Sequence, residues 1–207
     1  MKFLAALLLA LLGAASLRAD DLAAQVQAEL NLARTQPRAY ARIVAGNALG
    51  KRHLEGDRVV VEAVRFLEKA SPRPPLARSG GLSGSALAHV LDQGPSGGVG
   101  HRGGDGSSPW QRMARFGRWS GRAAENIAYG RPDARSIVVG LIVDDGVRDR
   151  GHRQNIFGRE FRYAGIATGP HAKYGTLCVI DFAAAFSDRG DEVAQRAALP
   201  APPFFRW

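Results

Sequence analysis

Apolar residues in the first half of the chain recur every three or four positions, which is the repeat of an amphipathic helix. The first such segment follows Asp20 and Asp21, two residues that can cap a helix. Its apolar positions are Leu22, Val26, Leu30 and Ala33. We therefore predict a helix here that ends or restarts near Pro37.

Four further helices are predicted from the same kind of pattern. One covers the apolar stretch 59–67, before the proline-rich segment 71–75, and another covers 82–90 and closes at Gly94 and Pro95. We expect these two and the first helix to form one layer. A third begins at Pro109, with Ser108 as cap and Gln111 three residues later, and runs to 116. The last opens at Pro132 and buries apolar positions in 137–142.

The second half of the chain favours strands. Apolar and β-branched residues predict strands over 123–129, 163–168 and 176–184, and the glycine-bounded segment 169–175 suits a hairpin turn between the last two. The regular alternation of strand and helix typical of parallel sheets is missing. We therefore predict an α+β fold in which helices flank a mostly antiparallel sheet.

The N-terminus has the pattern of a secretory signal peptide. Lys2 precedes an apolar run over 3–12, followed by small residues that permit cleavage near Ser16 or Ala19. The run is shorter than the roughly 20 apolar residues of a membrane-spanning helix. We assign residues 1–19 to a signal peptide, 20–190 to one domain and 191–207 to a proline-rich tail, and we expect a secreted or periplasmic protein.

Composition narrows the class of protein. With 207 residues, 45% hydrophobic and 23% charged, the chain has the balance of a folded globular domain. Its net charge of +9 comes almost entirely from arginine, since only four of the 28 basic residues are lysines. The arginines are scattered, so they reflect either base composition or an affinity for an anionic envelope surface. Without a basic stripe or a known motif, nucleic acid is not an expected partner.

The cysteine and the common catalytic motifs give little information about function. The only cysteine, Cys178, lies in an apolar run, where we expect a buried and inert thiol without a disulfide. The zinc-protease, nucleophile-elbow and phosphate-loop motifs do not occur in the sequence.

The histidines offer a better lead. His101 and His152 each follow a glycine in a predicted loop, whereas His89 lies in a predicted helix and is expected to be structural. His53 and His171 are expected to be solvated. Glu125, Asp144 and Asp145 are the acidic residues that folding could bring to His101 and His152.

Four ordered motifs begin at Gly100, Ala124, Gly151 and Val179 and read GHRG, AENIAYG, GHRQNI and VIDFA. Together they resemble the bacterial branch of the CAP superfamily, also called SCP domains. The resemblance runs from about Leu22 to about Phe186 and implies a single α-β-α sandwich. It also implies a central cleft lined by two histidines and two acidic residues. The histidines fall on His101 and His152 and the first acid on Glu125, while the second acid falls on Asp144, with Asp145 as the substitute.

The resemblance implies function less closely than fold. We expect a binding or effector module for an envelope or extracellular ligand, which is a lipid, glycan or peptide, and we expect a monomer. The cleft histidines, His101 and His152, are candidate ligands of zinc or another divalent cation. The alternative is a hydrolase of peptide or envelope substrates that uses His101, Glu125, Asp144 and His152. A purely structural cleft is a third interpretation.

Overall fold

The structure is a computed structural model that describes residues 21–189. The predicted signal peptide, the cap residue Asp20 and the predicted tail lie outside this range. Within it, no helix combines the length and the apolar character needed to cross a membrane.

The sheet has four strands in the order β1-β3-β4-β2. They are β1 (Ala77–Arg78), β2 (Gly117–Tyr129), β3 (Tyr163–His171) and β4 (Gly175–Asp188). Only the two-residue pairing of β1 with β3 is parallel, and both long pairings are antiparallel. This confirms the predicted mostly antiparallel sheet and the α+β class.

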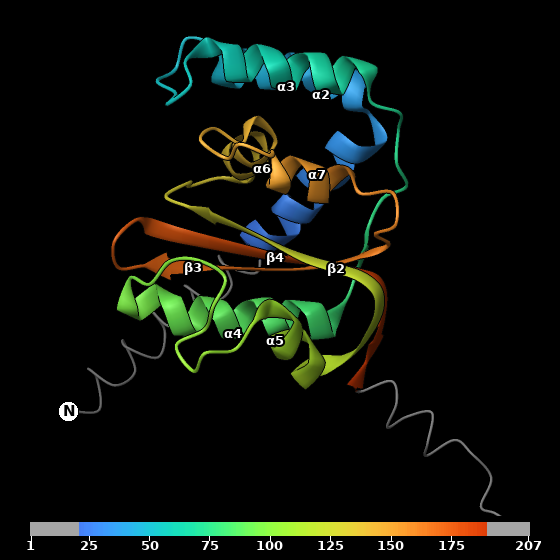
Figure 1. The fold of residues 1–207 in the computed structure, drawn as a ribbon, viewed down its shortest axis with the longest axis vertical. Coiled ribbons are helices and arrows are strands. Elements are labelled where there is room, and N and C mark those ends of the chain that lie inside the picture. Colours follow the sequence, from blue (N-terminus) through green and yellow to red (C-terminus); the bar gives the residue numbers. More distant parts are fainter. Residues whose placement is uncertain (1–20, 190–207) are drawn as a thin grey trace, which may run out of the picture.

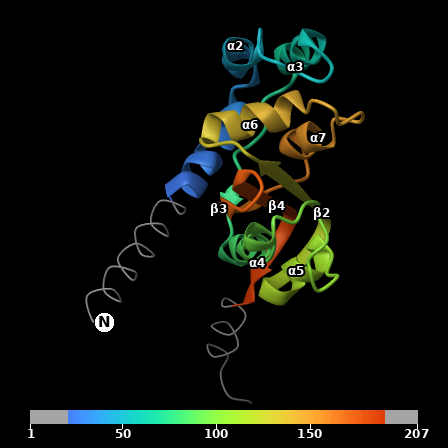
Figure 2. The same cartoon turned by 90° about the vertical axis from the view of Figure 1, so that its left-hand side faces the viewer.

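Helices cover both faces of the sheet, which completes an α-β-α sandwich (Figure 1 and Figure 2). On one face lie α4 (Gly80–Ser96) and α5 (Pro109–Phe116). On the other face lie a helix over 21–35, α6 (Ala134–Val143) and α7 (Gly151–Phe157), with α2 (Pro37–Ala48) and α3 (Asp57–Lys69) outermost. The expectation that the first helices form one layer is wrong, because α4 packs on the opposite face of the sheet.

The side-chain alternation of the strands explains the two layers. Cys178, Ile180 and Phe182 of β4 join the core beneath α6 and α7, whereas Leu177 and Val179 pack with Ala86 and Val90 of α4. Helix α4 lies so close to β3 that a Cβ at Gly165 would clash with the backbone at Leu82.

The thiol of Cys178 is buried in this core, as predicted. Burial raises its pKa to about 12, which keeps the thiol protonated and unreactive at neutral pH.

Several predicted boundaries move. Helix α4 continues through Pro95 to Ser96, and α6 begins at Ala134, with Asp133 rather than Pro132 at its start. Strand β2 starts directly after α5 at Gly117, six residues earlier than predicted, because it pairs with the extended end of β4. The hairpin between β3 and β4 is shorter than the predicted seven-residue link, because β3 continues to His171 and β4 begins at Gly175.

Candidate functional site

His101 forms the first of two histidine–carboxylate pairs. It lies in the loop between α4 and α5, and its ring atom Nδ1 is 2.8 Å from Oε1 of Glu125 on β2. The Glu125 side chain is 1% exposed, whereas that of His101 is 52% exposed. The buried carboxylate therefore orients an imidazole that solvent and ligands can reach.

Arg112 completes this pair and was not anticipated from the sequence. Its Nη2 donates to Oε2 of Glu125 at 2.6 Å, and its Nη1 donates to the backbone oxygen of His101 at 2.9 Å. The capping box of Ser108 and Gln111 starts α5 so that Arg112 points inward. Arg112 lies three residues after Pro109, on the buried face of α5. This spacing is the feature of the sequence from which its inward position could have been predicted.

Asp144 and His152 form the second pair. His152 Nδ1 is 2.6 Å from Oδ1 of Asp144, and the backbone N–H of His152 donates to Oδ2 at 2.9 Å. Asp144 follows α6 in the left-handed conformation, with φ of 58°. His152 lies in the first turn of α7 rather than in a loop, because the residues from Gly151 onward form that helix.

Asp145 points elsewhere. Its carboxylate accepts hydrogen bonds from the backbone N–H groups of Leu54 at 2.7 Å and Glu55 at 3.0 Å. It also lies 3.7 Å from Nδ1 of His53. Of the two neighbouring acids, Asp144 is therefore the one that pairs with His152.

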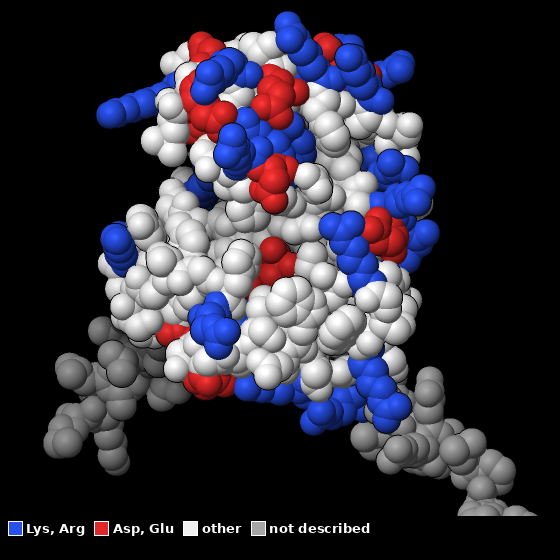
Figure 3. All heavy atoms as spheres, in the orientation of Figure 1, with Lys and Arg blue, Asp and Glu red and all other residues white. Residues whose placement is uncertain are grey.

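The two pairs lie on either side of β2, which is an edge strand of the sheet. Glu125 bonds His101 on the side of α4 and α5. The adjacent Asn126 faces the other side, where its Nδ2 donates to the backbone oxygen of His152 at 3.0 Å. Figure 3 shows this face hollowed between the two helical layers, with acidic atoms visible in the hollow.

An ion network holds the segment that carries Asp144 and His152. Arg150 donates to Glu55 at 2.7 Å and to Glu62 at 2.8 Å, and Arg153 donates to Glu62 at 2.8 Å. Arg153 also donates to the last carbonyls of α6. The network ties α3 to the connection between α6 and α7.

Asp181 lies beside Glu125 inside the protein. It is opposite Glu125 in the pairing of β2 with β4 and is fully buried. In the part of the chain that the structure describes, neither of its carboxyl oxygens has a hydrogen-bond partner. Burial raises the pKa of Asp181 well above its usual value, and the charge of Glu125 raises it further. The fold therefore favours the protonated, neutral form of Asp181.

The remaining histidines are structural. His89, expected to be structural, is buried, with Nε2 at 2.9 Å from the Gly100 oxygen, and burial lowers its pKa. The expectation that His53 and His171 are solvated is wrong. His171 is 2% exposed and its ring bonds the loop at Gly98, and the side chain of His53 is 13% exposed and bonds Ala48.

The metal hypothesis can be tested against the donors present. Each imidazole uses Nδ1 for a carboxylate, an arrangement common for metal-ligating histidines, which bind through the other nitrogen. The donor type therefore fits a divalent cation. Residues 21–189 nevertheless contain no group of three or more His, Cys, Asp or Glu residues that could hold a metal. A catalytic zinc site usually needs three protein ligands.

The sequence also matches a known protein family. Residues 19–182 match the profile of the CAP family, described as the cysteine-rich secretory protein family. The chain belongs to this family. The match covers both histidine–carboxylate pairs of this CAP domain and all of its described elements except the last six residues of β4. No curated protein sequence matches the chain at a significant level.

Three solved structures are similar to this CAP domain. An outer surface protein from Borrelia burgdorferi is 16% identical with a TM-score of 0.45, over 52% of this chain and 76% of that one. An extracellular SCP-domain protein from Bacillus anthracis is 19% identical, with a TM-score of 0.43 over 61% of this chain. A cysteine-rich secretory protein from Staphylococcus aureus is 14% identical, with a TM-score of 0.38 over 66%. This chain spans 39% and 42% of the last two.

Proposed function

We propose that this CAP domain is a binding or effector module that acts outside the cytoplasm on an envelope or extracellular ligand. The ligand is a lipid, glycan or peptide, and it contacts the two histidine–carboxylate pairs beside β2. The location rests on the predicted signal peptide and on membership of a family described as secretory.

The observation that carries this proposal is that both carboxylates are already engaged by the protein. Glu125 is held by His101 and Arg112, and Asp144 is held by the ring and backbone of His152. In residues 21–189 no hydrogen bond uses Nε2 of either imidazole. The site therefore offers two oriented ring nitrogens to a ligand, and in residues 21–189 no serine, threonine or cysteine is hydrogen-bonded to either ring as a nucleophile for it to activate. This arrangement favours binding over hydrolysis.

A divalent cation such as zinc is a second candidate ligand of the same nitrogens. His101 and His152 would hold it through Nε2, and the carboxylates behind them would strengthen both imidazoles as ligands. When bound, such a cation would supply a positive charge that attracts anionic ligand groups.

Binding to purified peptidoglycan and to phospholipid vesicles tests the proposal, with the parent chain compared with His101→Gln. We expect the variant to lose at least about ten-fold in affinity for the ligand that the parent binds. Glutamine removes the ring nitrogen while Arg112 still pairs with Glu125, so the fold is retained. Arg102→Gln is the matched control, because Arg102 is exposed in the same loop and, among residues 21–189, its side chain donates only to the Gly106 oxygen.

Zinc titration by calorimetry tests the cation, with heat expected for the parent and none for the double variant His101→Ala, His152→Ala. Equal heats would remove the cation from the proposal.

Turnover of peptidoglycan or of a peptide substrate that disappears in Glu125→Gln would contradict the binding module and support the hydrolase. Unchanged affinity in His101→Gln would show that the ligand binds elsewhere on the protein.

A further inference from the structure

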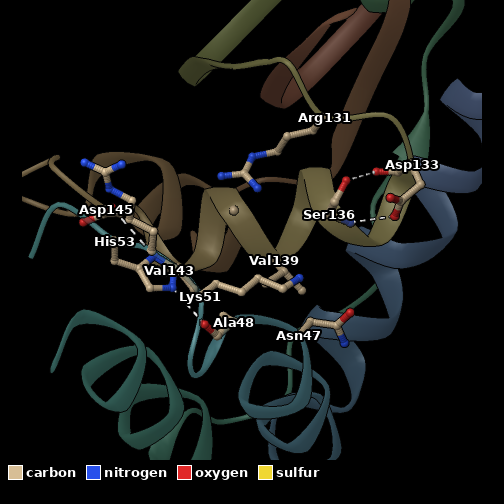
Figure 4. Close-up of a pocket in the computed structure, with 12 residues that line it drawn as sticks. Asn47, Ala48, Lys51, His53, Arg131, Asp133, Ser136, Val139, Val143 and Asp145 are labelled. Atoms are coloured by element: carbon tan, nitrogen blue, oxygen red, sulfur yellow. Dashed lines mark hydrogen bonds and ion pairs between the residues drawn. The ribbon is translucent and has the colours of Figure 1, made fainter. Parts of the chain in front are cut away.

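A second pocket lies on the far helical layer, between the end of α2 and the side of α6. Its volume is about 260 Å³. Ala48, Val139 and Val143 supply apolar lining, and Asn47 and Ser136 supply polar groups. Figure 4 shows this pocket with α6 along its length. None of its residues belongs to the two histidine–carboxylate pairs.

Three cationic side chains face this pocket. Arg131 precedes α6, and Lys51 and Arg52 lie in the loop after α2. In Figure 4 Arg131 lies across one side of the α6 backbone, and Lys51 approaches from the other side. For the residues that the structure describes, no hydrogen bond or ion pair involves the side chains of these three residues.

The position of Arg131 depends on Gly140. A Cβ at residue 140 would clash with the guanidinium carbon of Arg131, so only glycine lets the guanidinium lie against α6. This packing removes water from the group, and desolvation lowers the pKa of Arg131. The guanidinium remains charged at neutral pH. The fold therefore holds a partly desolvated cation at the pocket without a counter-ion in direct contact.

The other titratable groups at the pocket are already engaged. Asp133 accepts from the backbone N–H of Ser136 at 2.8 Å and caps α6. Asp145 accepts from two backbone N–H groups of the loop at residues 54 and 55. His53 uses Nε2 on the Ala48 oxygen. The two acids thus stabilise local structure, and the three cations are left to bind a ligand.

We propose that this pocket binds an oxyanion, the phosphate group of a small molecule or of a lipid headgroup. A guanidinium offers a planar pair of donors to phosphate oxygens, and a lysine adds a mobile positive charge. A phosphate oxygen could also accept from the Asn47 amide, which lines the same space and donates only one of its two N–H groups within the described residues, to the Ile43 oxygen. The apolar lining accommodates the carbon atoms next to the phosphate.

Calorimetric titration of the full chain with inorganic phosphate tests the site, with three variants. We expect one saturable site in the parent and at least a ten-fold loss of affinity in Arg131→Gln. Gly140→Ala should cause a similar loss although it removes no charge, because its Cβ displaces the guanidinium. Alanine is also the better helix former, so this variant should fold. Arg65→Gln, on the exposed face of α3, removes one charge elsewhere and should bind like the parent.

Two further probes separate the sources of phosphate. Glycerol 3-phosphate in solution and vesicles containing phosphatidic acid are compared with pure phosphatidylcholine vesicles. Tighter binding of the soluble ester than of the vesicles supports a free metabolite, and the reverse supports a headgroup. The proposal is overturned if no phosphate probe binds the parent, if Gly140→Ala binds like the parent, or if Arg65→Gln loses as much affinity as Arg131→Gln.

Discussion

At the scale of single residues, Arg34 shows how this domain tolerates a buried charge. It is fully buried, and its guanidinium donates to the backbone oxygens of Pro74, Ile156, Gly158 and Phe161. Burial lowers the pKa of Arg34 to about 10, so it stays charged at neutral pH. Carbonyl dipoles, rather than an acid, stabilise the cation, and the residue joins the first helix to the segments around α7.

Replacing this arginine should destabilise the fold. Arg34→Met fills similar volume but leaves buried carbonyls without donors, each of which costs about 1–3 kcal/mol. We expect the free energy of unfolding to fall by at least about 3 kcal/mol in chemical denaturation, because three of the four carbonyls lose their donor while that of Phe161 still accepts from Arg162. Arg38→Met is the matched control, since Arg38 is exposed and donates to one carbonyl, that of Glu68. An equal loss in both variants would show that the buried hydrogen bonds of Arg34 stabilise the fold no more than the exposed one of Arg38.

Asp181 should make stability fall as pH rises. Its pKa in the folded chain is raised, so above about pH 4 the unfolded chain releases a proton that the folded chain retains. The free energy of unfolding of Asp181→Asn should therefore rise relative to the parent by about 1.4 kcal/mol per pH unit above about pH 4, up to the folded pKa. Urea denaturation at several pH values measures this difference. Parallel pH profiles would mean that Asp181 is ionised in the fold.

Sequence reasoning found single residues of the site better than it found their partners. His101, Glu125 and His152 stand in recognisable motifs. Asp144 and Asp145 could be separated only by the left-handed turn that aims Asp144 at His152. Arg112 and Asp181 reach Glu125 through packing of α5 and through strand register. The spacing of Arg112 from Pro109 predicts that Arg112 is buried, but nothing in the sequence names Glu125 as the partner of either residue.

At the scale of elements, the connection between α6 and α7 is held by charge. Glu62 of α3 binds both Arg150 and Arg153, and the hydrogen bond from Arg150 is the main cause of its lowered pKa. The bond to Arg150 likewise lowers the pKa of Glu55 to about 2. These contributions are present above the ordinary carboxylate pKa of about 4.5 and are lost as pH falls toward 2.

Neutralising Glu62 should loosen this connection. We expect Glu62→Gln to lower the free energy of unfolding by about 1 kcal/mol at about pH 7, a small value because solvent screens a half-exposed carboxylate. The loss should shrink at acid pH, below the ordinary carboxylate pKa of 4.5, as the parent residue itself becomes protonated. Thermal unfolding at both pH values checks it. Glu68→Gln, exposed on the same helix, should have no effect at either pH.

Periodicity predicted most elements but not their placement. The three- and four-residue repeat identifies a helix such as α4, yet it does not say which face of the sheet the helix covers. That choice depends on long-range packing of Leu82, Ala86 and Val90 against alternate residues of β3 and β4. The starts of α6 and β2 moved for a similar reason, since a cap and a strand partner decide them.

At the scale of the whole molecule, the net charge is +9, or +7 once Lys2 and Arg18 are lost with the predicted signal peptide, and this charge makes a prediction about partners. If dispersed arginines attract an anionic envelope surface, affinity for anionic vesicles should fall at least about ten-fold between roughly 50 and 500 mM salt, because exposed charges are screened within about 8 Å at physiological ionic strength. Cosedimentation with vesicles measures this. Salt-independent binding would indicate that the arginine content reflects base composition alone. The expected monomer remains a prediction for sedimentation velocity.

The irregular pairing of β2 has a consequence for solubility. Between Ser120 and Ala123, β2 advances three residues while β4 advances two, and Gly121 there takes φ of 73°. This bulge interrupts the row of backbone groups along the free edge of the sheet. A neighbouring chain therefore cannot extend the sheet along the full length of β2, so the bulge guards an otherwise open edge against aggregation.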